Sequence, residues 1–226
     1  MLLTGTVLIG IALARSAHAA EPAALRAGME EASGWKVVET KTLAGVGEVV
    51  VQHKVVLGED CLAGETVAAL DPDVLLTAAT DVENQPKWSS WKVPEAKRLT
   101  AGATSFDYFQ LLDNPSPVSD RYWFVHARTS TEGGVRIFRW DQVDAEAQYP
   151  AALADLTSRY PGAVSTRTNL GDWTFSPETG GTRIRYRICT DAGGNIPRWV
   201  GEIAARSTLP GNIGDLVKEV RRRTGL

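Results

Sequence analysis

The chain has 226 residues, of which 43% are hydrophobic, so it can bury one sizeable core. This composition excludes a disordered or collagen-like chain. Its 24 basic and 27 acidic residues give a net charge of −3, which offers no strongly basic surface for nucleic acid. Two cysteines are too few for a four-cysteine zinc site. Seven tryptophans indicate either a large core or a cavity lined for an apolar guest.

The N-terminal segment has the pattern of a secretory signal peptide. An apolar run, Leu2–Ala14, is followed by Arg15-Ser16 and by the small-x-small sequence Ala17-His18-Ala19. We therefore expect cleavage after Ala19, export to the periplasm, and one mature domain of residues 20–226. An anchoring or buried helix is the weaker alternative, because the run is short for a bilayer span. No Lys or Arg precedes the run, so either the free amino terminus supplies the positive charge or the chain starts upstream.

The chain then predicts two helices among a series of strands. Leu25 and Met29, four apart, indicate an amphipathic helix over Glu21–Ser33. Asp71-Pro72 starts a second helix, with Asp as cap and Pro at the first helical position, which continues to about Thr80. Residues 58–64 are expected to form a turn and 149–162 a connection. Alternation predicts strands over Trp35–Thr42, Glu48–Leu57, Glu65–Ala69, Lys92–Leu99, Thr104–Leu112, Arg121–Ser130, Val135–Asp141, Thr166–Ser176 and Thr182–Thr190.

The spacing of these strands, with Gly-rich turns between them, favours one continuous antiparallel sheet. The C-terminal stretch changes to a helical period. A helix is expected to start at Asn195-Ile196-Pro197, with Trp199, Ile203 and Ser207 on one face. Pro210 should kink or break this helix.

Few residues support catalysis. After cleavage two histidines remain, His53 and His126, and both lie in predicted strands without a recognisable nucleophile. We interpret each as a hydrogen-bonded strand histidine rather than a catalytic base. The GxSxG, HExxH, P-loop and GxGxxG patterns are absent from the sequence. Asp107 and Asp120 could form an acid–base pair, but no motif supports it, so the residues favour binding over chemistry.

Four motifs follow one another along the chain. They are Asn84-Gln85-Pro86-Lys87-Trp88, Pro115-Ser116-Pro117-Val118-Ser119-Asp120-Arg121, Gly171-Asp172-Trp173-Thr174-Phe175-Ser176-Pro177 and Asp191-Ala192-Gly193-Gly194-Asn195-Ile196-Pro197-Arg198-Trp199. They resemble the Tyr-Pro-x-Trp, Pro-x-Pro-x-Ser-Asp-Arg, Gly-Trp-x-x-x-Pro and Asp-x-x-Gly-x-Ile-Pro-x-Trp segments of START domains, the StAR-related lipid-transfer family. The likeness spans nearly all of residues 20–226 and is that of a bacterial-type exported single-domain member.

The resemblance implies an α+β helix-grip fold. In that fold a curved antiparallel sheet wraps around a long C-terminal helix, and a hydrophobic tunnel between them holds one lipid. It implies a carrier of a sterol, phospholipid or other lipid, monomeric and in transient contact with membranes, rather than an enzyme. No cofactor, metal or nucleic acid is expected. The tunnel would be gated by the loop that contains Pro115, Pro117 and Val118, together with the segment from Pro197 onward.

Strand alternation indicates which side chains face this tunnel. In the last strand a row of three arginines, Arg183, Arg185 and Arg187, is expected in solvent. In the strand 104–112, parity alone does not choose between the face with Phe106 and the face with Asp107. The candidate lining residues, any of which could equally be plain core, are Phe106, Tyr108, Arg121, Trp123, Val125, Phe138, Trp140, Trp173, Ile184, Tyr186, Trp199, Ile203 and Ser207.

Arg121 and the two cysteines carry separate expectations. If Arg121 is buried it needs a partner, and we favour Asp120 or another carboxylate over a ligand head group. In the resembled fold the third strand lies antiparallel to the last one, so Cys61 and Cys189 would face each other. With export, we expect a disulfide between them rather than two buried thiols.

Two other functions remain open at this point. One is an enzyme of the polyketide aromatase/cyclase type on the same scaffold, with Asp107, Tyr108 or Arg121 acting inside the cavity. The other is a structural or partner-binding module with a filled core.

Overall fold

The computed structural model describes residues 21–194 and 198–226, without the side chains of residues 198–207. The predicted signal peptide and the predicted helix start at 195–197 lie outside these residues. The helices are α1 (Pro22–Glu30), α2 (Pro72–Thr80), the 3-10 turn η1 (Val82–Asn84), α3 (Gln85–Trp88), α4 (Ala145–Gln148), α5 (Pro150–Arg159) and α6 (Arg198–Thr224). The strands are β1 (Lys36–Leu43), β2 (Gly47–Val56), β3 (Glu59–Ala68), β4 (Glu95–Arg98), β5 (Ser105–Leu112), β6 (Arg121–Glu132), β7 (Val135–Gln142), β8 (Val164–Ser165), β9 (Thr168–Glu178) and β10 (Gly181–Asp191).

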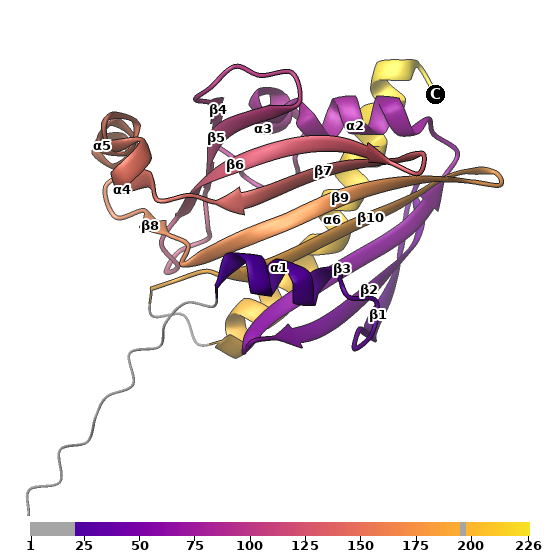
Figure 1. Ribbon diagram of the computed structural model, residues 1–226, viewed down its shortest axis with the longest axis horizontal. Coiled ribbons are helices and arrows are strands. Elements are labelled where there is room, and N and C mark those ends of the chain that lie inside the picture. The colour runs from indigo at the N-terminus through magenta and orange to yellow at the C-terminus, as the bar shows by residue number, and fades with distance from the viewer. Residues whose placement is uncertain (1–20, 195–197) are drawn as a thin grey trace, which may run out of the picture.

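The described strands form one ten-stranded sheet, in the order β1-β2-β3-β10-β9-β7-β6-β5-β4. Neighbours along this order are antiparallel, and the two-residue β8 adds a short parallel pair with β6. The sheet curves around α6, and α1 lies on the opposite side (Figure 1). We call the side toward α6 the concave face and the side that carries α1 the outer face. The predicted α+β helix-grip architecture is confirmed.

The main core lies on the concave face, between the sheet, α6 and α2. Leu209, Ile213 and Val217 of α6 are buried there, and α2 contributes Leu75. Each such side chain stabilises the fold by roughly 1.5–3 kcal/mol when fully buried. Gly64 of β3 allows α6 to approach the sheet, because a Cβ there would lie 2.0 Å from Leu209 Cδ2 and 2.6 Å from Ile213 Cδ1.

Short helices cover two parts of the outer face. Leu25 and Met29 of α1 pack over the strands near one end of the sheet. Leu156 of α5 packs on Phe109 and Phe124 of β5 and β6. Strands β5 and β6 are therefore covered on both faces, which matters for how their sequence is interpreted.

Three local predictions are wrong. Residues 59–64 continue strand β3, so the turn consists of Leu57 and Gly58 alone. Residues 150–159 form α5 within the expected connection, and Pro150 at its start is the helix signal that was available. Helix α6 runs through Pro210 without breaking. Burial of the apolar residues around it, such as Leu209 and Ile213, offsets the roughly 3 kcal/mol that an internal proline costs.

The remaining predicted elements are present with shifted ends. The helix at Asp71 is capped as expected, because its carboxylate accepts hydrogen bonds from the backbone N–H groups of Asp73 and Val74. The predicted strand from 166 is divided into β8 and β9. Strand β1 is an edge of the sheet, and all of its residues except Leu43 are exposed. Its pairing with β2 shifts register between Val37 and Glu39.

Candidate functional site

An unbroken series of aromatic rings crosses the concave face. The ring centroids of successive members are 4.4–6.1 Å apart, within the range of favourable ring pairs. We call this series the aromatic row. Its members, in order of contact, are Tyr108, Phe106, Phe138, Trp140, Tyr186, Trp173 and Phe175. All but the last are among the lining residues predicted from the sequence.

The register of four strands brings these rings to one face. Tyr186 of β10 pairs with Trp173 of β9, and Trp173 pairs with Phe138 of β7. On β5, Phe106 and Tyr108 belong to the core on the concave face, whereas Phe109 packs under α5 on the outer face. The structure thus settles the parity of β5 that the sequence left open.

Apart from Arg121, the other predicted lining residues divide into two groups. Trp123, Val125 and Ile184 lie on the concave face with the aromatic row. The side chains of Trp199, Ile203 and Ser207 are outside the described part of α6. Contact of these residues with a ligand stays a prediction.

Gly171 of β9 makes room for the ring of Trp140, one of the two indole rings of the row. A Cβ at this position would lie 2.4 Å from Cζ2 of Trp140 and 2.4 Å from the carbonyl oxygen of Arg187. The indole N–H of Trp140 donates to Asn169 Oδ1 at 2.9 Å, which fixes the orientation of the ring. The glycine of the sequence motif at 171–177 therefore serves the close packing of Trp140 against the strand.

Two hydroxyl groups interrupt the apolar character of the row. Tyr108 is 5% exposed and Tyr186 is 9% exposed. Burial raises the pKa of both phenols well above the ordinary value, and Tyr186 raises that of Tyr108 further. Both groups are therefore protonated and able to donate.

Arg121 stands at the start of β6, after the loop that contains Pro115, Pro117 and Val118. Its guanidinium donates to the carbonyl oxygens of Ser119, Ala192 and Gly193 at 2.6, 2.5 and 3.2 Å, rather than to the expected carboxylate. Burial lowers the pKa of Arg121, and the carboxylate of the favoured partner Asp120 acts on it through charge alone, which raises that pKa. Carbonyl oxygens satisfy the buried guanidinium without the desolvation of a second charge. These bonds join the two segments predicted to form a gate, the loop before β6 and the chain that leads to α6.

Comparison with solved structures places this geometry in a known fold. No protein-family model matches the chain, and neither does any curated protein. The STAR-related lipid transfer protein from Xanthomonas axonopodis superposes with a TM-score of 0.68 at 23% identity, covering 83% of this chain and 99% of that one. Human STARD10 gives 0.69 at 17% identity, covering 88% and 78%. The chain has the START fold.

A third START-fold neighbour is an enzyme. The Zhui aromatase/cyclase from Streptomyces sp. R1128 superposes with a TM-score of 0.52 at 13% identity, covering 73% of this chain and 94% of that one. The fold is thus shared by lipid-transfer proteins and by an aromatase/cyclase, so the choice between them depends on the residues of the site.

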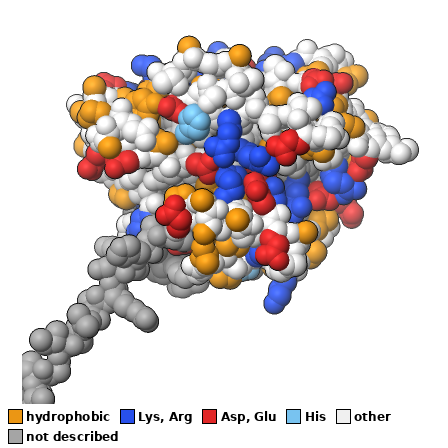
Figure 2. All heavy atoms as spheres, viewed as in Figure 1, with side chains coloured by type: hydrophobic (Ala, Val, Ile, Leu, Met, Phe, Trp, Pro, Cys, Tyr) orange, Lys and Arg blue, Asp and Glu red, His pale blue; other side chains and the backbone are white. Residues whose placement is uncertain are grey.

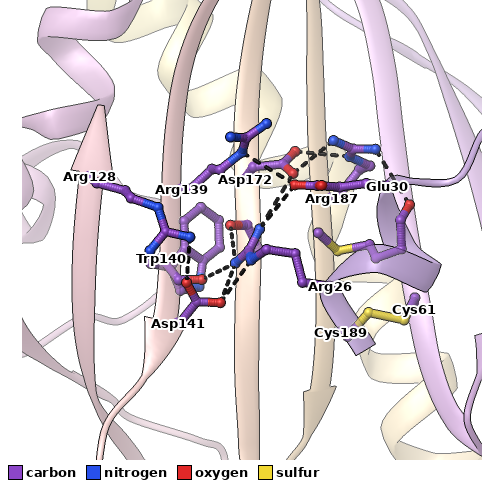
Figure 3. Close-up of polar contacts among 12 residues, drawn as sticks. Arg26, Glu30, Cys61, Arg128, Arg139, Trp140, Asp141, Asp172, Arg187 and Cys189 are labelled. Atoms are coloured by element: carbon purple, nitrogen blue, oxygen red, sulfur yellow. Dashed lines mark hydrogen bonds and ion pairs between the residues drawn. A yellow bond between two sulfur atoms is a disulfide. The ribbon is translucent and has the colours of Figure 1, made fainter. Parts of the chain in front are cut away.

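In this START fold a cluster of ionised side chains lies beneath α1 on the outer face (Figure 3). Asp172 of β9 is fully buried and accepts two hydrogen bonds from Arg187, from Nε at 2.9 Å and from Nη2 at 2.8 Å. Arg26 of α1 donates to Asp141 at 2.6 and 2.8 Å and to the carbonyl oxygen of Trp140 at 2.6 Å. The cluster fixes α1 on the sheet.

The cluster corrects the expectation for the arginine row of β10. Arg183 is exposed and pairs with Glu65 and Glu178. Arg185 is half-buried over the ring of Trp35, and burial lowers its pKa. Arg187 is buried with Asp172, so a solvent position is wrong for this residue. The helix α1, which comes from far away in the sequence, covers the end of the row.

Both histidines are hydrogen-bonded, as predicted. His53 Nε2 lies 2.9 Å from Asp60 Oδ1. On the outer face, His126 Nδ1 lies 2.5 Å from Asp107 Oδ1, and Nε2 lies 3.2 Å from Ser105 Oγ. Tyr149 also donates to Asp107, which joins the connection between α4 and α5 to the sheet. Asp107 is therefore engaged on the face opposite to the aromatic row.

The predicted disulfide is present. Cys61 and Cys189 lie directly opposite each other on β3 and β10, with a Cα–Cα distance of 4.1 Å, and their sulfur atoms are bonded. Both side chains are buried under α1. The bond joins strands that are 128 residues apart in the sequence.

Two pockets on the surface of the described residues have lining residues outside the aromatic row. One of about 460 Å³ lies between α3 and the end of α6, and its lining residues are Asp81, Asn84, Lys87, Trp88, Glu219, Arg222 and Arg223. One of about 380 Å³ is lined by Pro86, Ser89, Ser90, Trp91, Lys92, Val93, Pro94 and Asp113. On the outer face, basic and acidic side chains gather together at the centre (Figure 2).

Proposed function

We propose that this chain is a lipid-binding and lipid-transfer protein that holds one hydrophobic ligand between the concave face and α6. The aromatic row carries the proposal. Its rings offer a continuous apolar surface on the face that α6 covers, and they come from four strands of a fold shared with lipid-transfer proteins. An apolar guest gains roughly 0.8 kcal/mol per buried methylene, so such a surface binds an acyl chain or ring system with few polar contacts.

The aromatase/cyclase alternative is less well supported by the polar residues. Of the three groups that would act in its cavity, Asp107 lies on the outer face in hydrogen bonds with His126 and Tyr149. The guanidinium of Arg121 is occupied by backbone carbonyl oxygens. Tyr108 alone faces the concave side. A single protonated phenol does not supply an acid–base pair, so ligand carriage is the better account.

The proposal includes export and transient contact with membranes. The pattern of residues 1–19 and the Cys61–Cys189 bond support an oxidising compartment such as the periplasm, where disulfides persist. Among the described helices none is long and apolar enough to cross a membrane. The mature chain would act as a monomer, with the loop at Pro115 and Pro117 and the start of α6 opening for ligand exchange.

Native mass spectrometry of the protein purified from the periplasm of a bacterial host tests the proposal. A lipid adduct is expected, and the delipidated protein should take up lipid from liposomes. Uptake should also change the intrinsic tryptophan fluorescence, because Trp140 and Trp173 belong to the aromatic row. Replacing these two by Phe should remove the change, whereas Trp91→Phe, at the surface pocket, should retain it. Absence of an adduct and of any uptake would refute lipid binding.

A further inference from the structure

Helix α1 covers the Cys61–Cys189 disulfide on the outer face of the sheet. Both cysteines are 0% exposed, and they share one buried cluster with Leu25 and Met29 of α1 (Figure 3). Thiol–disulfide exchange begins when a thiolate attacks one of the two sulfur atoms. While α1 is docked, solvent touches neither cysteine, so a thiolate in solution does not reach the bond.

Side chains of the sheet and of the helix itself hold α1 in place. Arg26 of α1 donates two hydrogen bonds to Asp141 of β7, at 2.6 and 2.8 Å. Lys54 of β2 donates to the carbonyl oxygens of Gly28 at 2.7 Å and of Glu31 at 3.0 Å, at the C-terminal end of the helix. The helix takes no part in the strand pairing of the sheet. Its release therefore breaks side-chain contacts and leaves the sheet intact.

Release of α1 is the least costly way to expose the disulfide. The helix has nine residues, too few to be stable alone, and local opening of such an element costs less free energy than unfolding of the whole domain. The cysteines themselves lie on β3 and β10, in the interior of the sheet. Strand β3 is paired with β2 and β10, and β10 is paired with β3 and β9. Exposing the sulfur atoms by separating strands would break the main hydrogen-bonded ladder.

We propose that α1 is a removable cover that controls thiol–disulfide exchange at Cys61–Cys189. The reagent is a dithiol. Its first thiolate bonds to one cysteine sulfur and displaces the other as a thiolate, and its second thiolate then displaces the first cysteine. Two electrons and two protons pass from the dithiol to the cysteines, and the reagent becomes a disulfide. The same opening admits an oxidised dithiol reagent that forms the bond by the reverse steps. This inference is independent of the bound ligand.

The rate of reduction by dithiothreitol measures access to the bond. The exported protein is incubated with an excess of dithiothreitol without denaturant, samples are quenched with a maleimide, and the labelled thiols are counted by mass spectrometry. The native protein should be reduced far more slowly than the same protein unfolded in urea. Below the unfolding transition, the rate should rise with urea much less steeply than the unfolding equilibrium does, because release of a short helix exposes little surface.

Two variants loosen α1 at different contacts. Arg26→Ala removes the bonds to Asp141, and Lys54→Met removes the bonds to the carbonyl groups of the helix. Each should accelerate reduction of the native protein at least about tenfold, which is the effect of one hydrogen bond to a charged group on an opening equilibrium. The matched control is Leu156→Ala, which removes a fully buried side chain under α5. It should lower the urea midpoint of unfolding and leave the rate of native-state reduction unchanged.

Several results would overturn the inference. One is reduction of the native wild-type protein as fast as that of the unfolded protein, and another is a rate that follows the global unfolding equilibrium in urea. Equal acceleration by Leu156→Ala and by the two α1 variants would overturn it as well. If Arg26→Ala does not fold, Lys54→Met decides the question, because it leaves the ion pairs of Arg26 and Arg187 in place.

Discussion

Replacing Asp172 by Asn should destabilise the protein strongly, because it leaves Arg187 buried without its counter-charge. The carboxylate is fully buried and holds Arg187 through hydrogen bonds of 2.9 and 2.8 Å. Two unit charges about 4 Å apart attract by about 4 kcal/mol at an effective dielectric constant of 20. Removing one partner of a buried pair costs about 3–5 kcal/mol. We therefore expect a loss of about 4 kcal/mol, out of a total stability of about 5–15 kcal/mol for a domain.

Urea unfolding followed by tryptophan fluorescence measures this loss. The control is Glu65→Gln, which removes an ion-pair partner of Arg183. Arg183 is exposed and lies in the same strand as Arg187, so this loss should be less than about 1 kcal/mol. Arg187→Met and the double variant with Asp172→Asn complete a thermodynamic cycle. The double variant should lose less than the sum of the single losses. A loss for Asp172→Asn no larger than that of the control, or strictly additive losses, would refute the reasoning.

Three further results are expected. Changing Cys61 and Cys189 to Ala, or reducing the disulfide of the wild-type protein, should lower the free energy of unfolding by about 2–4 kcal/mol. The reason is that the bond closes a loop with a sequence separation of 128. An unchanged urea midpoint after reduction would contradict this. Gly171→Ala should displace the ring of Trp140, since a Cβ would lie 2.4 Å from it. We expect a loss of about 1–3 kcal/mol in the free energy of unfolding and a changed near-UV circular dichroism spectrum. An unaltered spectrum would argue against this packing. Hydrogen bonds from Arg222 and Arg223 lower the pKa of Glu219 from 4.5 to about 2. The contribution of the Glu219 carboxylate to the stability of the fold is therefore complete above pH 4.5 and is lost as the pH falls towards 2. Glu219→Gln should therefore remove about 2 kcal/mol of acid sensitivity in that window, and a melting curve with the same acid dependence in both proteins would disprove the effect.

Strand alternation predicted the sheet where one face of a strand is polar. In β10, Ile184 and Tyr186 alternate with arginines, and the concave face is evident. In β5 the same signal fails, because Phe106 is buried against the core while Phe109 is buried under α5. A strand covered on both faces has no polar side to mark its parity. The covering helix is specified by a segment some 40 residues later in the chain.

The buried ionic cluster was not predictable from local pattern. Arg187 belongs to a row of arginines that alternate with apolar residues, which is the pattern of a solvent-facing row. Its partner Asp172 is directly opposite on β9, so the pair emerges only when the register of two strands is known. The cover over the pair is α1, whose Met29 lies 158 residues away from Arg187 in the sequence.

Six of the seven residues of the aromatic row were predicted as candidate lining residues, and their order was not predicted. The motif resemblance identified the concave face, and alternation selected Trp140 and Tyr186. The order of the rings in the row depends on the register of neighbouring strands, to which no single stretch of sequence corresponds. The bond partners of Arg121 were equally hidden, because backbone carbonyl oxygens have no residue type to recognise.

The exposed edge strand β1 has a consequence for contacts between molecules. An edge strand presents unpaired N–H and C=O groups, to which a second chain can add a strand. Here Lys36, Glu39 and Lys41 are exposed on that edge, and the register shift after Val37 bends its backbone pairing. A second copy approaching β1 would have to desolvate these charges and match an irregular ladder. This edge of the sheet is thereby protected against growth by strand addition, although β1 itself is exposed.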